Sequence, residues 1–218
     1  MLLRDIMTTK VITIPSNMSV IDAKRLLAQK KLRRIPVVER GKLVGLLTAD
    51  RLDKVTPREL VSAGNVWDIA YAMATLHQTP VKEVMQKKVV TARPDMTVEE
   101  AVALAQSKRV GGLVVVEDGK KIVGIVTTND FFYNVVNPVL GIGQPGCRIE
   151  IAGGGETKAL EEIFSTIGKH NLEITTLQVI KLPNAVKKDL VVHLSCENVP
   201  QLIDELKSKG YKVELRKR

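Results

Sequence analysis

An internal repeat constrains the fold of this chain more than any other feature of its sequence. The first half matches the second at an offset of 78 positions, so that Met7 meets Met85 and Leu26 meets Leu104. One inserted residue near Lys121 raises the offset to 79, and the match then continues. So many matches at one offset indicate that a single structural unit has been duplicated.

Each copy of the unit has the same predicted order of elements. A short β-like stretch is followed by a helix that opens on a capping box, Thr97 with Glu100 in the second copy and Ser19 with Asp22 in the first. Two hydrophobic strands complete the unit, and the Asp-Gly pair at 118–119 between them is a hairpin signal. The pattern therefore predicts two α+β units in succession.

These motifs resemble the CBS domain. That family opens on hydrophobic-x-acidic-hydrophobic-Met, continues with V-x-T and R-x-P-V, and closes on G-h-h-T-x-N/D, where h is hydrophobic. CBS domains come in pairs that pack into one pseudo-twofold disc. The resemblance implies repeat 1 at residues 1–55, a helical connector at 56–79 and repeat 2 at 80–137. In the connector we expect the single tryptophan, Trp67, to be a packing residue.

The remaining segment, 146–218, is predicted to form a second domain with the order βαββαβ, which is ferredoxin-like. Asn171 falls where the first helix must turn into the second strand, a position that favours a left-handed residue. The order of elements and the Asn-Leu-Glu-Ile entry to the second strand resemble an ACT domain. A CBS pair followed by an ACT-like domain resembles the acetoin-utilisation protein B (AcuB) family, and its fold class is α+β.

The two domains are joined by the segment 138–145. This segment overlaps a stretch that fits the letter pattern of a nucleotide-binding motif. Residues 141–146 read GIGQPG and fit G-x-G-x-x-G, a motif that binds a pyrophosphate only where it follows a strand and opens a helix. Here a helix-like stretch precedes the motif and a strand-like stretch follows it, and Pro145 removes a backbone donor. We therefore interpret 138–145 as a linker.

The CBS resemblance implies ligand binding. Similar modules hold AMP, ADP, ATP or S-adenosylmethionine; a Thr or Ser ending the last strand contacts phosphate, and an Asp three residues later accepts the ribose hydroxyls. Repeat 2 matches this pattern with Thr127 and Asp130, but Gly112 stands where the family has the arginine of R-x-P-V. Repeat 1 has that arginine, Arg34, but Arg51 replaces the ribose carboxylate.

We therefore expect one occupied site, centred on Asp130. The cleft of repeat 1 is then either empty, or its arginines reach the phosphates of the ligand at Asp130. Candidate ligand-binding residues are Asp130, Asn129, Thr127, Thr91, Leu113, Val114, Arg34, Ile35, Pro36, Thr13, Thr48, Asp50 and Arg51. The alternative is that the Thr-Ala-Asp and Thr-Asn-Asp stretches are only turns, which these residue types favour.

No pattern in the sequence indicates catalysis. There is no Ser–His–Asp order, HExxH motif or P-loop, and the three histidines lack metal-ligand spacing, so we expect neither an enzyme nor a catalytic cofactor or metal. Cys147 and Cys196 form no CxxC pair. The ferredoxin-like layout puts them on neighbouring strands, where two reduced thiols, a bridge and a redox switch are the alternatives.

Net charge, aromatic content and hydropathy restrict the classes of function that this chain can have. The net charge of +9 suits an anionic ligand or nucleic acid, but aromatic residues make up only 3% and offer little surface for base stacking. The apolar runs are too short to cross a bilayer, and Asp5 interrupts the stretch where a signal peptide needs an apolar core, so we expect a cytoplasmic protein.

The favoured function is a regulatory sensor of an adenosine compound. It would act as a homodimer, because both module types resemble families that pair. A basic regulator associated with nucleic acid and a regulatory subunit of an enzyme are the alternatives.

Overall fold

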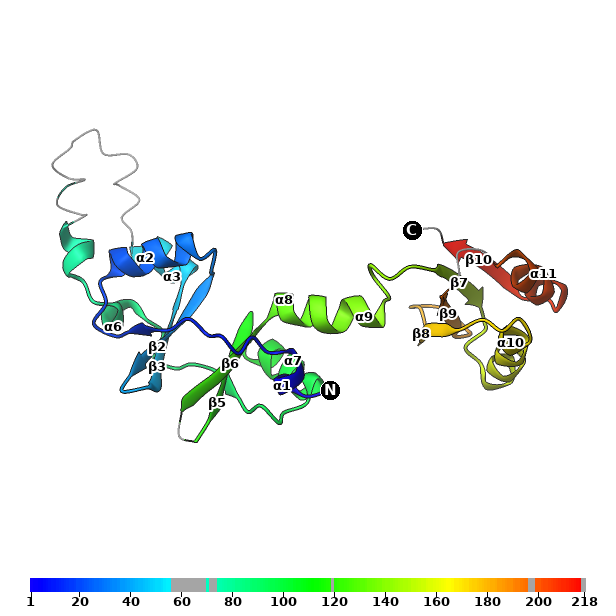
Figure 1. Cartoon of the computed structure of the whole chain (residues 1–218), viewed down its shortest axis with the longest axis horizontal. Coiled ribbons are helices and arrows are strands. Elements are labelled where there is room, and N and C mark those ends of the chain that lie inside the picture. Colours follow the sequence, from blue (N-terminus) through cyan, green and yellow to red (C-terminus); the bar gives the residue numbers. More distant parts are fainter. Residues whose placement is uncertain (56–69, 71–73, 119, 196–198, 217–218) are drawn as a thin grey trace. The chain divides into compact units, whose positions relative to one another are not determined.

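The structure, a computed structural model, divides into two compact units, Met1–Phe131 and Phe132–Arg218 (Figure 1). The residues that it describes are 1–55, 70, 74–118, 120–195 and 199–216. Trp67 and most of the predicted connector lie outside these ranges.

A six-stranded sheet forms the framework of the first unit. Its strands are, in spatial order, β1 (Ile14–Pro15), β2 (Arg34–Glu39), β3 (Lys42–Thr48), β6 (Lys121–Thr127), β5 (Gly112–Glu117) and β4 (Thr91–Ala92). Each repeat supplies three strands, the outer pair parallel and the inner pair antiparallel. The two halves meet where Lys42 pairs with Lys121. The duplicated α+β plan is therefore confirmed.

The two repeats agree in the details of strand pairing. Arg34 pairs with Thr48 in repeat 1, and Gly112 pairs with Thr127 in repeat 2. In each hairpin the register shifts after the fourth residue of the first strand, between Val37 and Val38 or the equivalent pair of repeat 2. Equivalent sequence positions therefore occupy equivalent places, which permits a residue-by-residue comparison of the repeats.

Two long helices begin at the predicted caps. They are α2 (Val20–Gln29) and α7 (Val98–Ser107). The hydroxyl of Ser19 accepts a hydrogen bond from the backbone N–H of Asp22 at 3.1 Å. The hydroxyl of Thr97 accepts from the N–H of Glu100, whose carboxylate accepts in turn from the N–H of Thr97. The capping box is therefore complete in the second copy. The short helices α3 (Ala49–Val55) and α8 (Thr128–Phe131) follow the last strand of each repeat.

The opening helix of each repeat packs on the other repeat. The first residue of α1 (Leu3–Ile6) donates its N–H to the carbonyl of Met96, in repeat 2. The first residue of α6 (Val81–Val84) donates to the carbonyl of Met18, in repeat 1. Each repeat therefore completes the fold of its neighbour.

A methionine directly after each opening helix covers a glycine of the other repeat. Met7 lies against Gly124 in β6, and Met85 lies against Gly45 in β3. A Cβ atom at either glycine would collide with the thioether sulfur. This contact gives a physical reason for the Met and Gly of the repeated motif.

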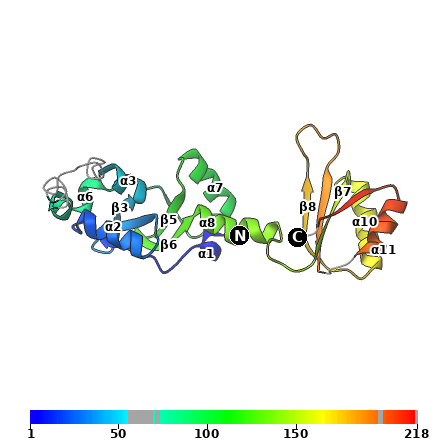
Figure 2. The same cartoon turned by 90° about the horizontal axis from the view of Figure 1, so that it is seen from above.

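The second unit is a βαββαβ fold. Its elements are β7 (Cys147–Ala152), α10 (Thr157–Lys169), β8 (Ile174–Ile180), β9 (Asp189–Leu194), α11 (Pro200–Ser208) and β10 (Lys212–Arg216). The antiparallel strands lie in the order β10-β7-β9-β8, which is the ferredoxin-like order. Both helices lie on one side of this sheet (Figure 2). Asn171 has a φ of 53°, as the sequence predicts.

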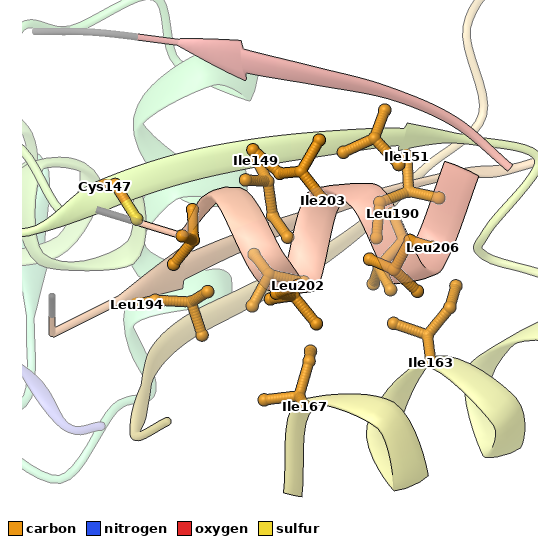
Figure 3. Packing of buried hydrophobic residues seen from close by; sticks show 13 residues of the cluster. Cys147, Ile149, Ile151, Ile163, Ile167, Leu190, Leu194, Leu202, Ile203 and Leu206 are labelled. Atoms are coloured by element: carbon orange, nitrogen blue, oxygen red, sulfur yellow. The ribbon is translucent and has the colours of Figure 1, made fainter. Parts of the chain in front are cut away.

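One apolar core joins the sheet and the two helices of the second unit. Alternate residues of β7 and β9, among them Ile149, Ile151 and Leu190, point toward Ile163 of α10 and Leu206 of α11 (Figure 3). All five side chains are fully buried. This core is separate from the apolar clusters of the repeats.

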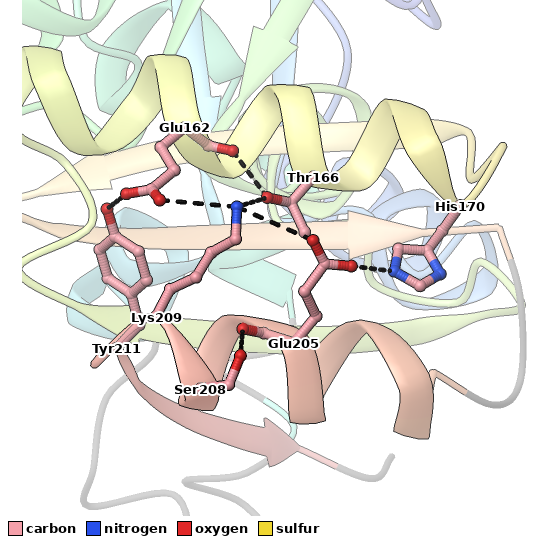
Figure 4. A network of polar contacts seen from close by, with 7 residues as sticks. All are labelled: Glu162, Thr166, His170, Glu205, Ser208, Lys209 and Tyr211. Carbon is pink, nitrogen blue, oxygen red and sulfur yellow. Dashed lines mark hydrogen bonds and ion pairs between the residues drawn. The ribbon is translucent and has the colours of Figure 1, made fainter.

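A polar network joins α10 and α11 (Figure 4). The ammonium group of Lys209 donates to the hydroxyl of Thr166 at 3.0 Å and lies 3.5 Å from a carboxylate oxygen of Glu162. It lies 3.7 Å from one carboxylate oxygen of Glu205, and the other oxygen of Glu205 contacts the ring of His170 at 2.8 Å. The network thus places one cation between two carboxylates from different helices.

The segment that precedes β7 consists of η1 (Phe132–Val136), a π-helical turn, followed by α9 (Asn137–Val139) and turns up to residue 146. The ring of His193 donates to the carbonyl of Pro145 at 3.1 Å. The side chain of Gln178 donates to the carbonyl of Val139. The GIGQPG stretch thus lies between a helix and a strand. Among the described residues no helix is long and apolar enough to cross a membrane.

Candidate functional site

A cleft of about 470 Å³ within the first unit is lined by both repeats. Repeat 1 supplies Thr8 and residues 10–12, the residues that enter β2, and the turn where α3 begins. Repeat 2 supplies Gly111 and the end of β6 with the start of α8. Its volume lies within the range of small-molecule sites.

The repeat 2 side of the cleft offers hydrogen-bond acceptors. Thr127 ends β6, and Asn129 and Asp130 lie in the first turn of α8. One carboxylate oxygen of Asp130 accepts from both the N–H and the hydroxyl of Thr127, each at 2.7 Å. These two bonds fix the orientation of the carboxylate and use only part of its capacity, because an ionised carboxylate has about four lone-pair sites.

The repeat 1 side of the cleft offers a guanidinium group. Arg34 begins β2 and lies across the two glycines of repeat 2: a Cβ atom on Gly111 would lie 2.9 Å from one of its terminal nitrogens, and one on Gly112 would collide with the other. Burial lowers the pKa of Arg34, the charge of Arg33 lowers it further, and Asp50 opposes both. The guanidinium is thus partly desolvated, and it lines the same cleft as the acceptors of repeat 2.

This contact explains the glycine at the R-x-P-V position of repeat 2. Arg34 and Gly112 are equivalent in the two copies, and the side chain of the first fills the space that the second leaves open. Repeat 2 therefore does not lack an arginine at its cleft, since repeat 1 supplies it.

Seven of the thirteen candidate residues line this cleft: Arg34, Pro36, Thr48, Asp50, Thr127, Asn129 and Asp130. The other six do not line it: Thr13, Ile35, Arg51, Thr91, Leu113 and Val114. Ile35 and Leu113 are fully buried, because alternate strand residues face opposite sides of a sheet. Thr91 pairs with Val114 at the edge of the sheet. Arg51 is exposed and donates to the carbonyl of Val84 at 3.1 Å.

Several lining residues were missed by motif comparison. They include the cations Lys10, Lys31 and Arg33 and the small or apolar residues Thr8, Val11, Ile12, Leu32, Gly111, Ile125 and Thr128. The repeat carries one signal that could have found Arg33, because its equivalent in repeat 2 is Gly111. A charge in only one copy indicates a role that the shared fold does not require.

The other candidate features have structural partners or lie outside the described residues. The glycine-rich loop after β7 uses its amides internally: Gly153 donates to the carboxylate of Asp189, and Gly155 donates to the carbonyl of Lys188. Cys147 is buried at the start of β7, and Cys196 lies outside the described residues. In the described part of the chain, no three His, Cys, Asp or Glu side chains could hold a metal ion.

The comparison with known families agrees with the duplicated architecture. The family model of the CBS domain matches residues 3–56 and again 81–137. The chain belongs to the CBS domain family. The family model ends at residue 137, so the ACT-like character of the second unit stays a prediction.

Curated relatives share the CBS pair. The CBS domain-containing protein YhcV from Bacillus subtilis is 36% identical over 134 residues, which are 60% of this chain and 83% of YhcV. An L-aspartate semialdehyde sulfurtransferase from Methanocaldococcus jannaschii is 36% identical over 131 residues, 59% of this chain. The chain spans only 22% of the length of that enzyme. This chain therefore resembles only a small part of that enzyme, and the enzyme's activity is a property of the longer protein.

Solved structures share the same CBS-pair fold. A protein from Vibrio cholerae that is named for acetoin utilization (AcuB) aligns with a TM-score of 0.52 at 25% identity, over 63% of this chain and 91% of its own. CBSX2, solved in complex with AMP, aligns with a TM-score of 0.51 at 22% identity, over 62% of this chain and 96% of its own. The predicted CBS pair and its likeness to the AcuB family are confirmed.

Proposed function

We propose that this protein is a cytoplasmic regulatory sensor, without catalytic activity of its own, that binds one adenosine compound in the cleft of its CBS pair. One observation carries the proposal: Thr127 and Asp130 of repeat 2 line the same cleft as Arg34 of repeat 1. Acceptors for a ribose and a donor for an anionic group therefore lie around one space.

The carboxylate of Asp130 is suited to a ribose. A ribose diol presents two O–H donors, and a carboxylate accepts two such donors in a defined geometry. The bonds from Thr127 hold the carboxylate in place before a ligand arrives, so less orientational freedom is lost on binding.

The repeats are not equivalent as ribose sites. Arg51 takes the place of the carboxylate in repeat 1, and a guanidinium has donors only, so it cannot accept a hydroxyl proton. Its side chain is engaged with the carbonyl of Val84 outside the cleft. We therefore propose a stoichiometry of one nucleotide for each chain.

We further propose that the ligand signal reaches the second unit, an ACT-like domain at 146–218, through the segment 138–145. Asp130 lies two residues before the second unit begins at Phe132. Within that unit, the carbonyl groups of Val139 and Pro145 accept hydrogen bonds from strands β8 and β9. A shift at the start of this segment would therefore act on side chains of the sheet.

The proposed assembly is a homodimer. Strand β8 is an edge of the second sheet, and Leu177, Val179 and Ile180 on it are 41%, 41% and 37% exposed. An exposed edge with apolar side chains favours pairing with another strand. Sedimentation at micromolar concentration should show twice the mass of 24.0 kDa, and a species of only that mass would rule out the dimer.

Calorimetry on the full chain tests the ligand. We expect adenosine compounds to bind and guanosine compounds to bind more weakly. The Asp130→Ala change should weaken binding by about 1.5–3 kcal/mol, because it removes a charged acceptor. Asp53→Ala is a matched control, since it removes a carboxylate in α3 that does not line the cleft. Wild-type affinity in a folded Asp130→Ala protein would show that the site is misplaced.

A further inference from the structure

The helix-free face of the second sheet is covered at β9. Both helices of the second unit lie on the other side of the sheet (Figure 2). Leu190, Val192 and Leu194 belong to the core on the helix side, so the residues that alternate with them face away from the helices. These residues, Val191 and His193, are nevertheless only 6% and 1% exposed. A part of the unit other than its helices therefore buries them.

Residues 139–146, called the strap below, contact this face at two points. The ring of His193 donates through Nε2 to the carbonyl of Pro145 at 3.1 Å. Nearer the start of the strap, the side-chain amide of Gln178 donates to the carbonyl of Val139. The strap is thus held on the sheet by side chains from two strands, β8 and β9.

One nitrogen of the His193 ring has no hydrogen-bond partner. A carbonyl oxygen only accepts, so Nε2 carries the hydrogen of the bond to Pro145, and Nδ1 of the neutral ring is an acceptor. Nδ1 is buried and is unpaired within the described residues. Protonation would place a second N–H donor at Nδ1 and a positive charge on the ring. A buried donor or charge without a partner is costly, so the closed strap disfavours the protonated ring.

The described charged groups around His193 do not favour a second charge there. The strap reads VLGIGQPG and contains no ionisable side chain. On β7, the cationic residue Arg148 pairs directly with His193. The next carboxylate on that strand, Glu150, is held by Arg216 at 2.6 Å. On β8 the residue opposite His193 is Thr176, which is not ionisable. A protonated ring would therefore lie beside a cation.

We propose that the strap is a pH-sensitive device, closed while His193 is neutral and open when His193 is protonated. Opening exposes the ring to water, which supplies the hydrogen-bond partners that the closed state lacks. Opening also detaches residues 139–146 from the sheet, so that the chain in front of β7 is no longer fixed to β8 and β9. The proposal goes beyond the adenosine site and does not depend on it.

The protonation states give the direction and the size of the effect. An imidazole in water takes up a proton below about pH 6.5, and the closed strap disfavours that proton. The open state therefore binds more protons than the closed state, so the equilibrium constant for opening rises as the pH falls. The rise is about tenfold for each pH unit below about 6.5.

Hydrogen exchange of the full chain, followed by mass spectrometry, measures strap opening. Amides of residues 140–144 bond only within local turns, which are marginal in an undocked segment. We expect their protection to fall about tenfold between about pH 7.5 and about pH 5.5, after correction for intrinsic exchange. The amides of β9 should stay protected. Equal strap protection at both pH values would overturn the proposal, as would a loss that β9 shares, because the whole unit would then be unfolding.

Two substitutions in the same unit separate His193 from other groups. His193→Gln keeps an N–H donor for Pro145 but cannot take up a proton, so strap protection should differ by less than about twofold between the two pH values. His170→Gln is the matched control, because His170 contacts a carboxylate oxygen of Glu205 at 2.8 Å and lies away from the strap on the helix side. It should keep the wild-type pH dependence. If His193→Gln keeps it as well, another group titrates and the proposal is wrong.

The wild-type protein provides a second measurement that needs no folded variant. The NMR signals of the His193 ring should move over the same pH range in which the strap loses protection. Titration of this ring over a different range would refute the link between the two. A strap that becomes better protected at low pH would show that an acceptor reaches Nδ1, which would also overturn the proposal.

Discussion

The contact between Met85 and Gly45 provides a quantitative test of how the repeats hold each other. A Cβ atom on Gly45 would collide with the sulfur of Met85 and lie 2.8 Å from its Cγ. Met85 is only 9% exposed, so its side chain has little room to move. We expect Gly45→Ala to lower the free energy of unfolding of the CBS pair by about 1–3 kcal/mol, as overpacking does in other cores.

The effect should depend on the methionine. Met85→Ala alone should cost about 2–5 kcal/mol, because it removes buried atoms and leaves a cavity. In the double variant the new methyl group enters the space that the sulfur has left. The combined cost should therefore be smaller than the sum of the two single costs by about 0.5–3 kcal/mol.

Urea unfolding of the full chain, followed by circular dichroism, measures these costs. Gly168→Ala is the control: this helical glycine of the second unit has no atom within 4 Å of an added Cβ, so the change should leave the CBS-pair transition in place. Met7 and Gly124 provide an internal replicate of the same contact. Additive costs at both contacts would show that the methionines do not occupy the glycine sites in solution.

Two further predictions concern the cleft and the second unit. Gly112→Ala should lower the melting temperature more than Gly111→Ala does. A Cβ atom on Gly112 would lie 2.7 Å from a backbone oxygen as well as against Arg34, whereas one on Gly111 would meet only the flexible side chain of Arg34. Equal melting temperatures of the two variants would contradict this prediction. The hydrogen bond from Tyr211 lowers the pKa of Glu162 below the ordinary value of 4.5. The stability that this bond contributes is therefore complete above pH 4.5 and is lost as the pH falls through the lowered pKa of Glu162. Tyr211→Phe should therefore flatten the acid dependence of unfolding of the second unit, measured by circular dichroism, and an unchanged dependence would refute the assignment.

Local rules predicted much of the fold from the sequence. Capping at Ser19 and Thr97 and the left-handed turn at Asn171 depend on residues close in sequence, and the structure has all three. The duplicated strand order followed from the repeat, because two similar sequences form similar units. Neither conclusion required knowledge of long-range contacts.

The site was harder to predict because it depends on contacts between the repeats. Motif positions alone did not show that Ile35 and Leu113 point away from the cleft. Lys31 and Arg33 belong to no motif, yet they line the cleft that both repeats form. From the sequence alone, repeat 2 lacks the arginine of the motif at Gly112. The structure shows that the side chain of Arg34 occupies the space at Gly112.

The shared space of Arg34 and Gly112 has an evolutionary consequence. In a symmetric dimer of two identical single-repeat chains, both copies must carry the same residue at this position. Two arginines would then compete for one volume, and two glycines would leave it without a cation. Joining the copies in one gene allows each to mutate separately, so that one can keep the large charged side chain while the other makes room for it. Fusion thus permits a polar ligand to be bound in a single direction across an axis of near symmetry.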